Sequence, residues 1–415
     1  MVINKISTLI AGSAFAQFIS FAAAPILTRL YSPEDFGTLS ILSGWVGVLA
    51  VLVTGKYSEA IVLQKKESDA VNLFALSVII TVIFFSLTGL FLYLYSEQIR
   101  ALHDLKKIYD WYCILILLVL VNGLQQAASG WVNRGEKYNT ITACKVIQVL
   151  AISTTAIVMP IVGFGGGLIW GELAGALLAC VYIYYEITPD LKSLGGNVSM
   201  GRMKELSMRH VVFPTINLLH SLSDVFQVTG VVFLISINYG DRVLGCYALA
   251  MKVMRAPISM ITSSVAQVLY VRLINDFNSG RDMRVLLNKF MIIVGVGVLP
   301  VYTALMLFGA PLFEYLFGSQ WRDAGVYVQL LSPWVGLSVI SSVMSFLPLI
   351  VGEQKKFFII SLIGNSIPII VFLLLPYIDF EILASLRLLG CVMVIHASLS
   401  VVWLYRLSNR KYMEA

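Results

Sequence analysis

The chain has 415 residues, of which 58% are hydrophobic and only 13% are charged. Because ordinary soluble domains carry about 25% charged residues, this composition excludes a water-soluble enzyme, a nucleic-acid-binding domain and a disordered chain. The formal net charge of +6 does not indicate nucleic acid as a partner, since the basic residues lie between long apolar stretches, as they do in membrane proteins.

Twelve apolar segments of the chain are each long enough to cross a membrane as a helix, which requires about 20 residues. The predicted spans are, in chain order, residues 7–30, 36–63, 71–96, 109–132, 140–163, 166–189, 209–237, 243–272, 285–308, 325–351, 356–378 and 382–406. We therefore predict an all-α polytopic membrane protein with about 12 transmembrane helices.

The largest polar break lies at the middle of the chain. It separates a predicted N-terminal six-helix lobe (1–189), a cytoplasmic linker (190–208) and a C-terminal six-helix lobe (209–415). The first span is followed by Tyr31, five residues and a glycine, and the seventh span by Tyr239 with the same spacing. Because each half has an even number of spans, we expect two pseudo-symmetric lobes of the same orientation around a central cavity.

Basic residues are unevenly distributed between the two sides of this predicted topology. If the N-terminus is cytoplasmic, the segments facing the cytoplasm hold 19 Lys and Arg residues and the outer segments hold 6. This bias predicts that both termini are cytoplasmic. The start of the chain is predicted to be an uncleaved first helix rather than a signal peptide, because its apolar stretch continues to Leu30.

Two N-terminal segments carry a resemblance to a known family. Residues 24–40 (APILTRLYSPEDFGTLS) resemble the first helix-loop-helix of bacterial polysaccharide (O-antigen) flippases, which belong to the multidrug/oligosaccharidyl-lipid/polysaccharide exporter superfamily. Residues 57–63 (YSEAIVL), with the polar turn after them, are also similar to that family. The topology is similar over the whole chain.

The resemblance implies a function, a location and a set of partners. It implies movement of undecaprenyl-pyrophosphate-linked oligosaccharide, an O-antigen or similar surface polysaccharide unit, from the cytoplasmic to the periplasmic leaflet by alternating access. The location implied is the bacterial inner membrane, and the pathway is lipopolysaccharide or related polysaccharide biosynthesis. The implied partners are the polyprenyl-linked substrate and membrane lipid, with H⁺ or Na⁺ and the polysaccharide polymerase machinery as further candidates. No cofactor is expected.

Two alternatives stay open. An ion-coupled multidrug exporter of the same superfamily is disfavoured because the deepest charges are mostly basic, whereas cationic drugs require carboxylates. A membrane polysaccharide polymerase is less favoured still, because the longest predicted outer connections, residues 97–108 and 309–324, are short for a catalytic site. The chain is therefore predicted not to be an enzyme and to have no catalytic residues.

Two basic residues lie deep in the predicted eighth span. Lys252 is about 14 Å and Arg255 about 18 Å from its outer end, at 1.5 Å per residue. In a hydrocarbon layer of about 30 Å, both lie near the midplane. Because they are three residues apart, they share one helix face. They predict a cationic cavity wall that binds the pyrophosphate; the alternative is an ion pair with Asp224 on the seventh span.

Two further cations are candidate substrate-binding residues. Lys56 lies in the second span, the repeat partner of the eighth, so it would add positive charge to the other lobe. Alternatively its stem reaches the interface and its charge pairs with Glu59, a candidate coupling or charge-balancing residue. Arg29, at the outer end of the first span, is predicted to bind substrate or to act as an anchor.

Polar residues recur on one face of the predicted seventh helix. They are Asn217, His220, Asp224 and Gln227, at spacings of three, four and three residues. Gln17 belongs to a weaker polar stripe on the first helix. Such faces either contact sugar hydroxyls in a cavity or hold helices together. The carboxylate of Asp224 is predicted to titrate in an ion-coupled cycle or to balance the basic residues, and no metal site is predicted.

Overall fold

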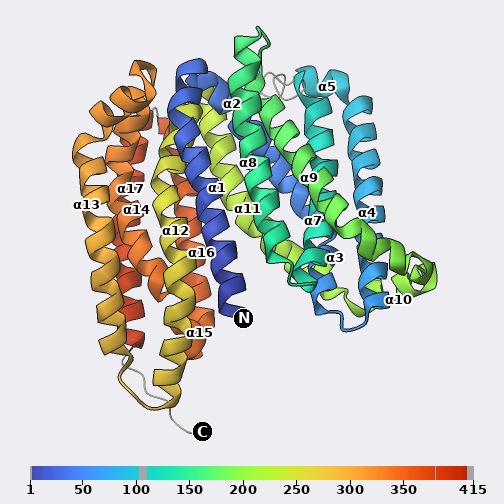
Figure 1. Cartoon of the computed structure of the whole chain (residues 1–415). Helices are drawn as coiled ribbons and strands as arrows, with labels where there is room; N and C mark the ends of the chain where they lie inside the picture. The colour runs from blue at the N-terminus through green and yellow to red at the C-terminus, as the bar shows by residue number, and fades with distance from the viewer. Residues whose placement is uncertain (1, 102–109, 379, 409–415) are drawn as a thin grey trace. The chain divides into compact units, whose positions relative to one another are not determined.

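The structure is a computed structural model that describes residues 2–101, 110–378 and 380–408 (Figure 1). Every regular element of these residues is helical. The elements up to residue 194 are α1 (Val2–Leu30), α2 (Pro33–Leu52), α3 (Tyr57–Ala60), η1 (Ile61–Leu63), α4 (Glu67–Leu94), α5 (Ser96–Ala101), α7 (Tyr112–Arg134), α8 (Tyr138–Ile161) and α9 (Gly167–Leu194). The longer elements that follow are α10 (Met200–Arg209), η4 (Phe213–Asn217), α11 (Leu218–Tyr239), α12 (Asp241–Asn278), α13 (Met283–Phe317), α14 (Arg322–Met344), α15 (Leu347–Ile350), α16 (Gln354–Leu374) and α17 (Ile382–Leu407).

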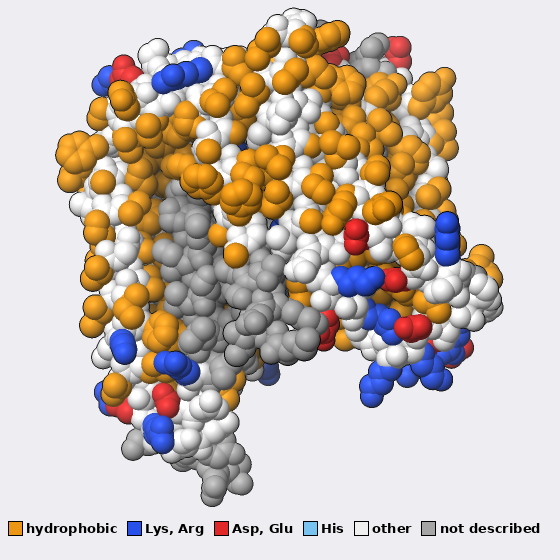
Figure 2. All heavy atoms as spheres, viewed as in Figure 1, with side chains coloured by type: hydrophobic (Ala, Val, Ile, Leu, Met, Phe, Trp, Pro, Cys, Tyr) orange, Lys and Arg blue, Asp and Glu red, His pale blue; other side chains and the backbone are white. Residues whose placement is uncertain are grey.

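Eleven helical segments of the described residues are long and apolar enough to cross a membrane. They coincide with all the predicted spans except the eighth, which α12 covers with 38 residues. The side chains of α12 at residues 256–268, 270 and 271 lie outside the described part of the chain, so the eighth predicted span stays a prediction. Broad areas of hydrophobic side chains face outward on the helices of both units in Figure 2, with Lys, Arg, Asp and Glu gathered near the helix ends. The predicted all-α membrane architecture is confirmed.

The chain forms two compact units, Met1–Tyr31 with Asp35–Phe233 and Ser32–Glu34 with Leu234–Ala415. Corresponding spans pack together in both units: α4 on α7 and α13 on α14, α7 on α9 and α14 on α17, and α8 on α9 and α16 on α17. The same pairs in each half are what an internal repeat requires. The predicted lobe boundaries stay a prediction; α10 and the first part of α11 belong to the first unit.

The two tyrosines that marked the sequence repeat have corresponding places in the two units. The Tyr31 hydroxyl donates to the Ala156 carbonyl oxygen at 2.7 Å, near the end of the fifth span. The Tyr239 hydroxyl lies 2.8 Å from Ser385 Oγ, near the start of the twelfth span. In each half, the tyrosine at the end of the first span therefore forms a hydrogen bond near the turn between the fifth and sixth spans of that half.

Two segments predicted to be connections contain helix. Residues 309–324 do not form an outer loop, because α13 continues to Phe317. The buried rings of Phe313 and Phe317, with centroids 4.9 Å apart, extend the apolar packing beyond the predicted membrane boundary. In the predicted linker 190–208, α9 continues to Leu194 and α10 begins at Met200. Of residues 97–108, only 97–101 lie within the described residues, and they are part of α5.

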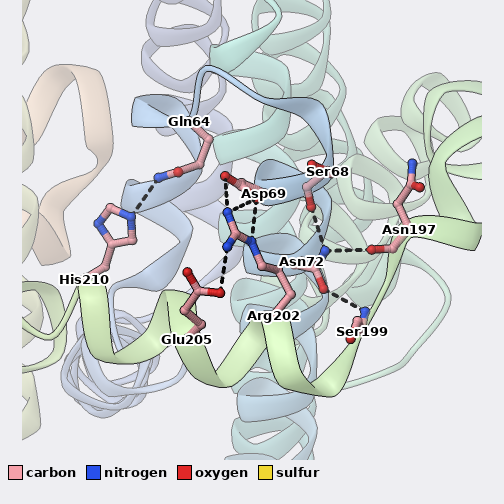
Figure 3. Close-up of polar contacts among 9 residues, drawn as sticks. All are labelled: Gln64, Ser68, Asp69, Asn72, Asn197, Ser199, Arg202, Glu205 and His210. Carbon is pink, nitrogen blue, oxygen red and sulfur yellow. Dashed lines mark hydrogen bonds and ion pairs between the residues drawn. The ribbon is translucent and has the colours of Figure 1, made fainter.

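Helix α10 packs against the start of α4, and Figure 3 shows the polar contacts between them. Met203 and Leu206 are buried, so one face of α10 is apolar. The Arg202 guanidinium donates to both carboxylate oxygens of Asp69, through Nε at 2.8 Å and Nη2 at 2.9 Å. Asn72 adds hydrogen bonds to the backbone that leads into α10, at Asn197 O and Ser199 N, both 2.8 Å. This part of the connection between the halves is therefore a fixed component of the first unit.

Replacing the buried Asp69 with alanine is expected to destabilise the first unit measurably, because the Arg202 guanidinium loses its bidentate partner and α10 loses its charged attachment to α4. The Asp69 side chain is 9% exposed. Thermal unfolding of the purified protein measures the effect. Glu205→Ala is the matched control. It removes the other carboxylate bound to Arg202, and the Glu205 side chain is 58% exposed. The control substitution is expected to lower the free energy of unfolding by less than about 1 kcal/mol. Equal losses of stability in the two variants would contradict a special role for Asp69.

Candidate functional site

The second predicted span is broken within the first unit. Helix α2 ends at Leu52 and α3 begins at Tyr57, and between them Gly55 and Lys56 have left-handed φ angles of 55° and 62°. Glycine adopts this conformation freely, whereas a residue with a Cβ pays about 1–2 kcal/mol. In a membrane, such non-helical backbone persists only where protein buries it or where it lines a water-filled cavity. Val53, Thr54 and Ser58 at the break are buried, and the question is whether a cavity adjoins them.

A polar pocket of about 540 Å³ lies at this break, between the second span and α7. The lining residues are Ala50, Val51, Lys56, Ser58, Glu59, Val62, Asn122, Gln125, Gln126, Ser129, Gly130 and Asn133. Most of these carry an amide, a hydroxyl or a charge. The pocket is in the size range of small-molecule sites.

One wall of the polar pocket is a stripe of polar side chains along α7. It consists of Asn122, Gln125, Gln126, Ser129 and Asn133, at helical spacings of three and four residues that place them on one face. The sequence interpretation missed this stripe. The signal was nevertheless present, because amide and hydroxyl residues recur at the same spacing as those that marked the seventh helix, within an otherwise apolar span.

The broken backbone fits closely against two glycines of α7. A Cβ on Gly130 would overlap the carbonyl oxygen of Ser58. A Cβ on Gly123 would meet the Thr81 side chain of α4 first, with Cγ2 at 2.5 Å, and then Val53 Cγ2 at 2.8 Å. The two glycines are seven residues apart, so they lie on the same side of the helix. The absence of a side chain at Gly130 lets the backbone of Ser58 approach α7 this closely.

Gln126 compensates the polar groups that the break exposes. Its Nε2 donates to the carbonyl oxygen of Ala50 at 2.8 Å, in the last turn of α2, where carbonyl groups lose their helical partners. Its Oε1 accepts from Thr54 Oγ1 at 3.2 Å, and Thr54 Oγ1 lies 3.2 Å from Ser58 Oγ. Gly55 and Lys56 are thus held in place by the close contact with α7 and by the hydrogen bonds that Gln126 forms with Ala50 and Thr54.

Lys56 and Glu59 form an ion pair at the polar pocket, with Nζ 2.7 Å from Oε1. The Lys56 side chain is 15% exposed and that of Glu59 is 49% exposed. The pairing that the sequence left open for these two residues is therefore present. The two charges compensate each other at the pocket wall.

Helix α3 and the connection that follows it form hydrogen bonds with α7 and with the α10 segment. Arg134 Nε donates to the Gln64 carbonyl oxygen at 2.9 Å, and Tyr57 Oη donates to Ser207 O at 3.1 Å. Gln64 Nε2 lies 3.1 Å from His210 Nε2 (Figure 3). Burial and the nearby charge of Arg209 lower the pKa of His210, which favours the neutral imidazole at pH 7. These contacts connect the pocket wall to the α10 attachment.

The other residues predicted for the site lie on three helices. On α11 and the π-helix η4 that precedes it, Asn217 and Gln227 are half-buried, and His220 Nδ1 lies 3.3 Å from Asp224 Oδ2 with both side chains exposed. Gln17 is half-buried and Arg29 is exposed on α1. Lys252 and Arg255 are exposed on α12, which belongs to the second unit, whereas Asp224 belongs to the first. The structure thus brings together Lys56 with Glu59 and His220 with Asp224.

Comparison with known proteins places these features in a family. Residues 26–326 match the model of the family described as polysaccharide biosynthesis protein, and the chain belongs to this family. No curated protein matches the chain. This family match, together with the fold described in the next paragraph, confirms the family resemblance that residues 24–40 and 57–63 indicate.

Three solved structures with a similar fold are described as transporters of the MOP superfamily. An inward-facing multidrug resistance MATE family transporter of the MOP superfamily has a TM-score of 0.71 at 15% identity, over 94% of each chain. An outward-facing one has a TM-score of 0.58 at 14% identity, over 98% of this chain and 95% of that chain. A MOP superfamily transporter from Pyrococcus furiosus, described as having a binding pocket of reverse polarity, has a TM-score of 0.59 at 15% identity, over 97% and 95%. The protein therefore has the MATE-like transporter fold.

Proposed function

We propose that this protein is a flippase that moves a polyprenyl-pyrophosphate-linked oligosaccharide from the cytoplasmic to the periplasmic leaflet by alternating access. The family supports a role in polysaccharide biosynthesis, and the fold supports transport rather than catalysis. The observation that carries the proposal is the exposure of Lys252 and Arg255, one turn apart and about a third of the way along the 38-residue helix α12. Charged groups at membrane depth are costly unless they serve a cavity, a partner or a substrate.

In the proposed mechanism, the two basic side chains hold the pyrophosphate through charge-assisted hydrogen bonds. The polyprenyl chain stays in lipid, and lobes corresponding to residues 1–189 and 209–415 rock around the bound headgroup. Asp224 and its His220 neighbour form a candidate site for the coupling ion, H⁺ or Na⁺. We place the protein in the inner membrane with both termini cytoplasmic, which puts α10 and the Lys and Arg side chains around it (Figure 2) on the cytoplasmic side.

A deletion strain tests the proposal. Complete lipid-linked oligosaccharide units are expected to accumulate in the cytoplasmic leaflet, out of reach of a glycosidase added to the periplasmic side, and the full-length gene restores access. Short but translocated chains would overturn the proposal in favour of a polymerase. Normal surface polysaccharide with drug hypersensitivity would overturn it in favour of an ion-coupled multidrug exporter, the second candidate, which the exposed carboxylate of Asp224 favours.

Replacing Lys56 with glycine is expected to separate stability from transport. Glycine has no Cβ, so it relieves the cost of the φ angle of 62° by about 1 kcal/mol, and the partly exposed ion pair lost is worth less than about 1 kcal/mol. Thermal stability should therefore stay the same or rise slightly. Transport should fall severalfold, because the substitution leaves the Glu59 carboxylate as an uncompensated negative charge at the wall of the polar pocket. Surface polysaccharide and thermal unfolding are measured on the same variant, and a large loss of stability would show that Lys56 is structural.

A further inference from the structure

We infer that the polar pocket of the first unit binds the hydroxyl groups of a sugar, and so acts as a glycan subsite separate from the Lys252 and Arg255 pair. This assignment rests on the proposed function for its source of sugar, the oligosaccharide of the lipid-linked substrate. The chemistry of the pocket wall points to this ligand in three respects: its unused hydrogen-bonding groups, its charge balance and its rigidity.

Several polar groups of the α7 stripe have capacity for a ligand. Within the described part of the chain, the side chains of Ser129 and Asn133 form no hydrogen bond with protein, although both line the pocket. Asn122 donates through Nδ2 to Leu118 O at 2.8 Å, and Gln125 donates through Nε2 to Ala176 O at 2.9 Å. Among the described residues, the carbonyl oxygens of these two amides accept no hydrogen bond. The stripe therefore offers both donors and acceptors to a ligand.

The charge of the pocket favours a neutral polar ligand. Of its lining residues, only Lys56 and Glu59 carry a formal charge, and they are paired at 2.7 Å. A free pyrophosphate would have to compete with Glu59 for the single ammonium group. A metal cation would have one carboxylate ligand and would be repelled by that ammonium. Hydroxyl groups both donate and accept hydrogen bonds, so a sugar matches amides and serines without any change of charge.

The wall that carries these groups is rigid. Gly123 and Gly130 pack against the broken segment of the second span, and Gln126 ties α7 to the last turn of α2. The Gln125 amide is fixed to α9 through Ala176, so its position does not depend on the ligand. A preorganised wall reduces the entropy that binding costs, which suits the weak individual hydrogen bonds of a sugar. The volume of about 540 Å³ is sufficient for a small-molecule ligand.

Saturation-transfer NMR on the full-length protein in lipid nanodiscs tests the assignment. The probes are methyl glycosides of hexoses and of N-acetylhexosamines. The combined variant Asn122→Leu, Ser129→Ala and Asn133→Leu removes polar groups, none of which holds another helix in place. Because each net hydrogen bond contributes about 0.5–1.5 kcal/mol, glycoside affinity is expected to fall at least about tenfold. Asn139→Leu, an exposed asparagine on α8 outside the pocket, is the matched control and should keep wild-type affinity.

The outcomes distinguish this inference from the flippase proposal. If no glycoside shows saturation transfer to the wild-type protein, or if the combined variant binds as well as the control while both unfold at the same temperature, the glycan subsite is wrong. If inorganic pyrophosphate displaces the glycosides and its own binding is lost in the combined variant, the pocket is an anion site and the inference is also overturned. Glycoside binding lost only in the combined variant supports the subsite. The leaflet assay of the deletion strain tests flipping independently of all these results.

Discussion

Substitution of both Lys252 and Arg255 by alanine is expected to abolish surface polysaccharide while the protein remains folded. Both side chains are exposed, so their loss removes little packing. In the proposed mechanism they provide the charge-assisted hydrogen bonds to the pyrophosphate, which are about twice as strong as neutral ones. Losing both should weaken the apparent affinity for the lipid-linked substrate by about 100-fold or more. Surface polysaccharide in a complemented deletion strain and thermal unfolding of the purified variant are the two measurements.

A matched pair of basic residues controls for the change in net charge. Arg322 and Lys356 are 64% and 63% exposed, and their ion-pair partners Glu314 and Glu353 are 41% and 15% exposed. Their combined replacement by alanine removes the same charge and is expected to leave surface polysaccharide unchanged, because exposed pairs contribute little. Normal polysaccharide from the Lys252 and Arg255 variant would contradict the assigned role. So would an equal loss from the control, since the effect would then follow from net charge alone.

Gly130→Ala is expected to lower stability by about 2 kcal/mol or more and to reduce the yield of folded protein. The new Cβ would overlap the carbonyl oxygen of Ser58, which is backbone and cannot rotate away. Overpacking of this kind typically costs about 1–3 kcal/mol. Relief requires separation of α7 from the broken segment, which would also change the polar pocket. Thermal unfolding monitored by size-exclusion chromatography in detergent measures the loss.

Gly297→Ala is the control for the same change of residue. No atom lies within 4 Å of a Cβ at Gly297, which is in the interior of α13. Alanine is favoured over glycine within a helix by about 1 kcal/mol, so this variant should be as stable as the wild type or slightly more so. If Gly130→Ala behaved in the same way, the close packing of α7 on the second span would not be needed for stability.

The membrane spans were predictable because they depend on a property of short segments. Crossing a bilayer requires about 20 apolar residues wherever they stand in the fold, and helices must satisfy their own backbone hydrogen bonds there. The positions of α4, α7, α8 and α9 therefore agree with residues 71–96, 109–132, 140–163 and 166–189 within a few residues. The pairing of His220 with Asp224 likewise follows from their spacing of four residues on one helix.

The candidate site was predictable only in part. Lys56 and Glu59 were identified because charges are rare in apolar spans. The α7 stripe could have been found by the same spacing rule, since Asn122, Ser129 and Asn133 recur on one face. Their convergence with Lys56 depends on a packing contact between segments more than 60 residues apart, which no local pattern encodes.

Local physics thus specifies where most of the membrane-spanning helices lie along the chain, their order and the rare charges within them, since each depends on a helix and its solvent. The break in the second span has a different cause. Nothing in the local sequence around Gly55 and Lys56 specifies its backbone path. Lys56 adopts its unfavourable φ angle where Gly130 admits the backbone and Gln126 binds the carbonyl group of Ala50. A conformation that is costly for the isolated segment is selected by its neighbours, so the polar pocket exists only in the folded unit.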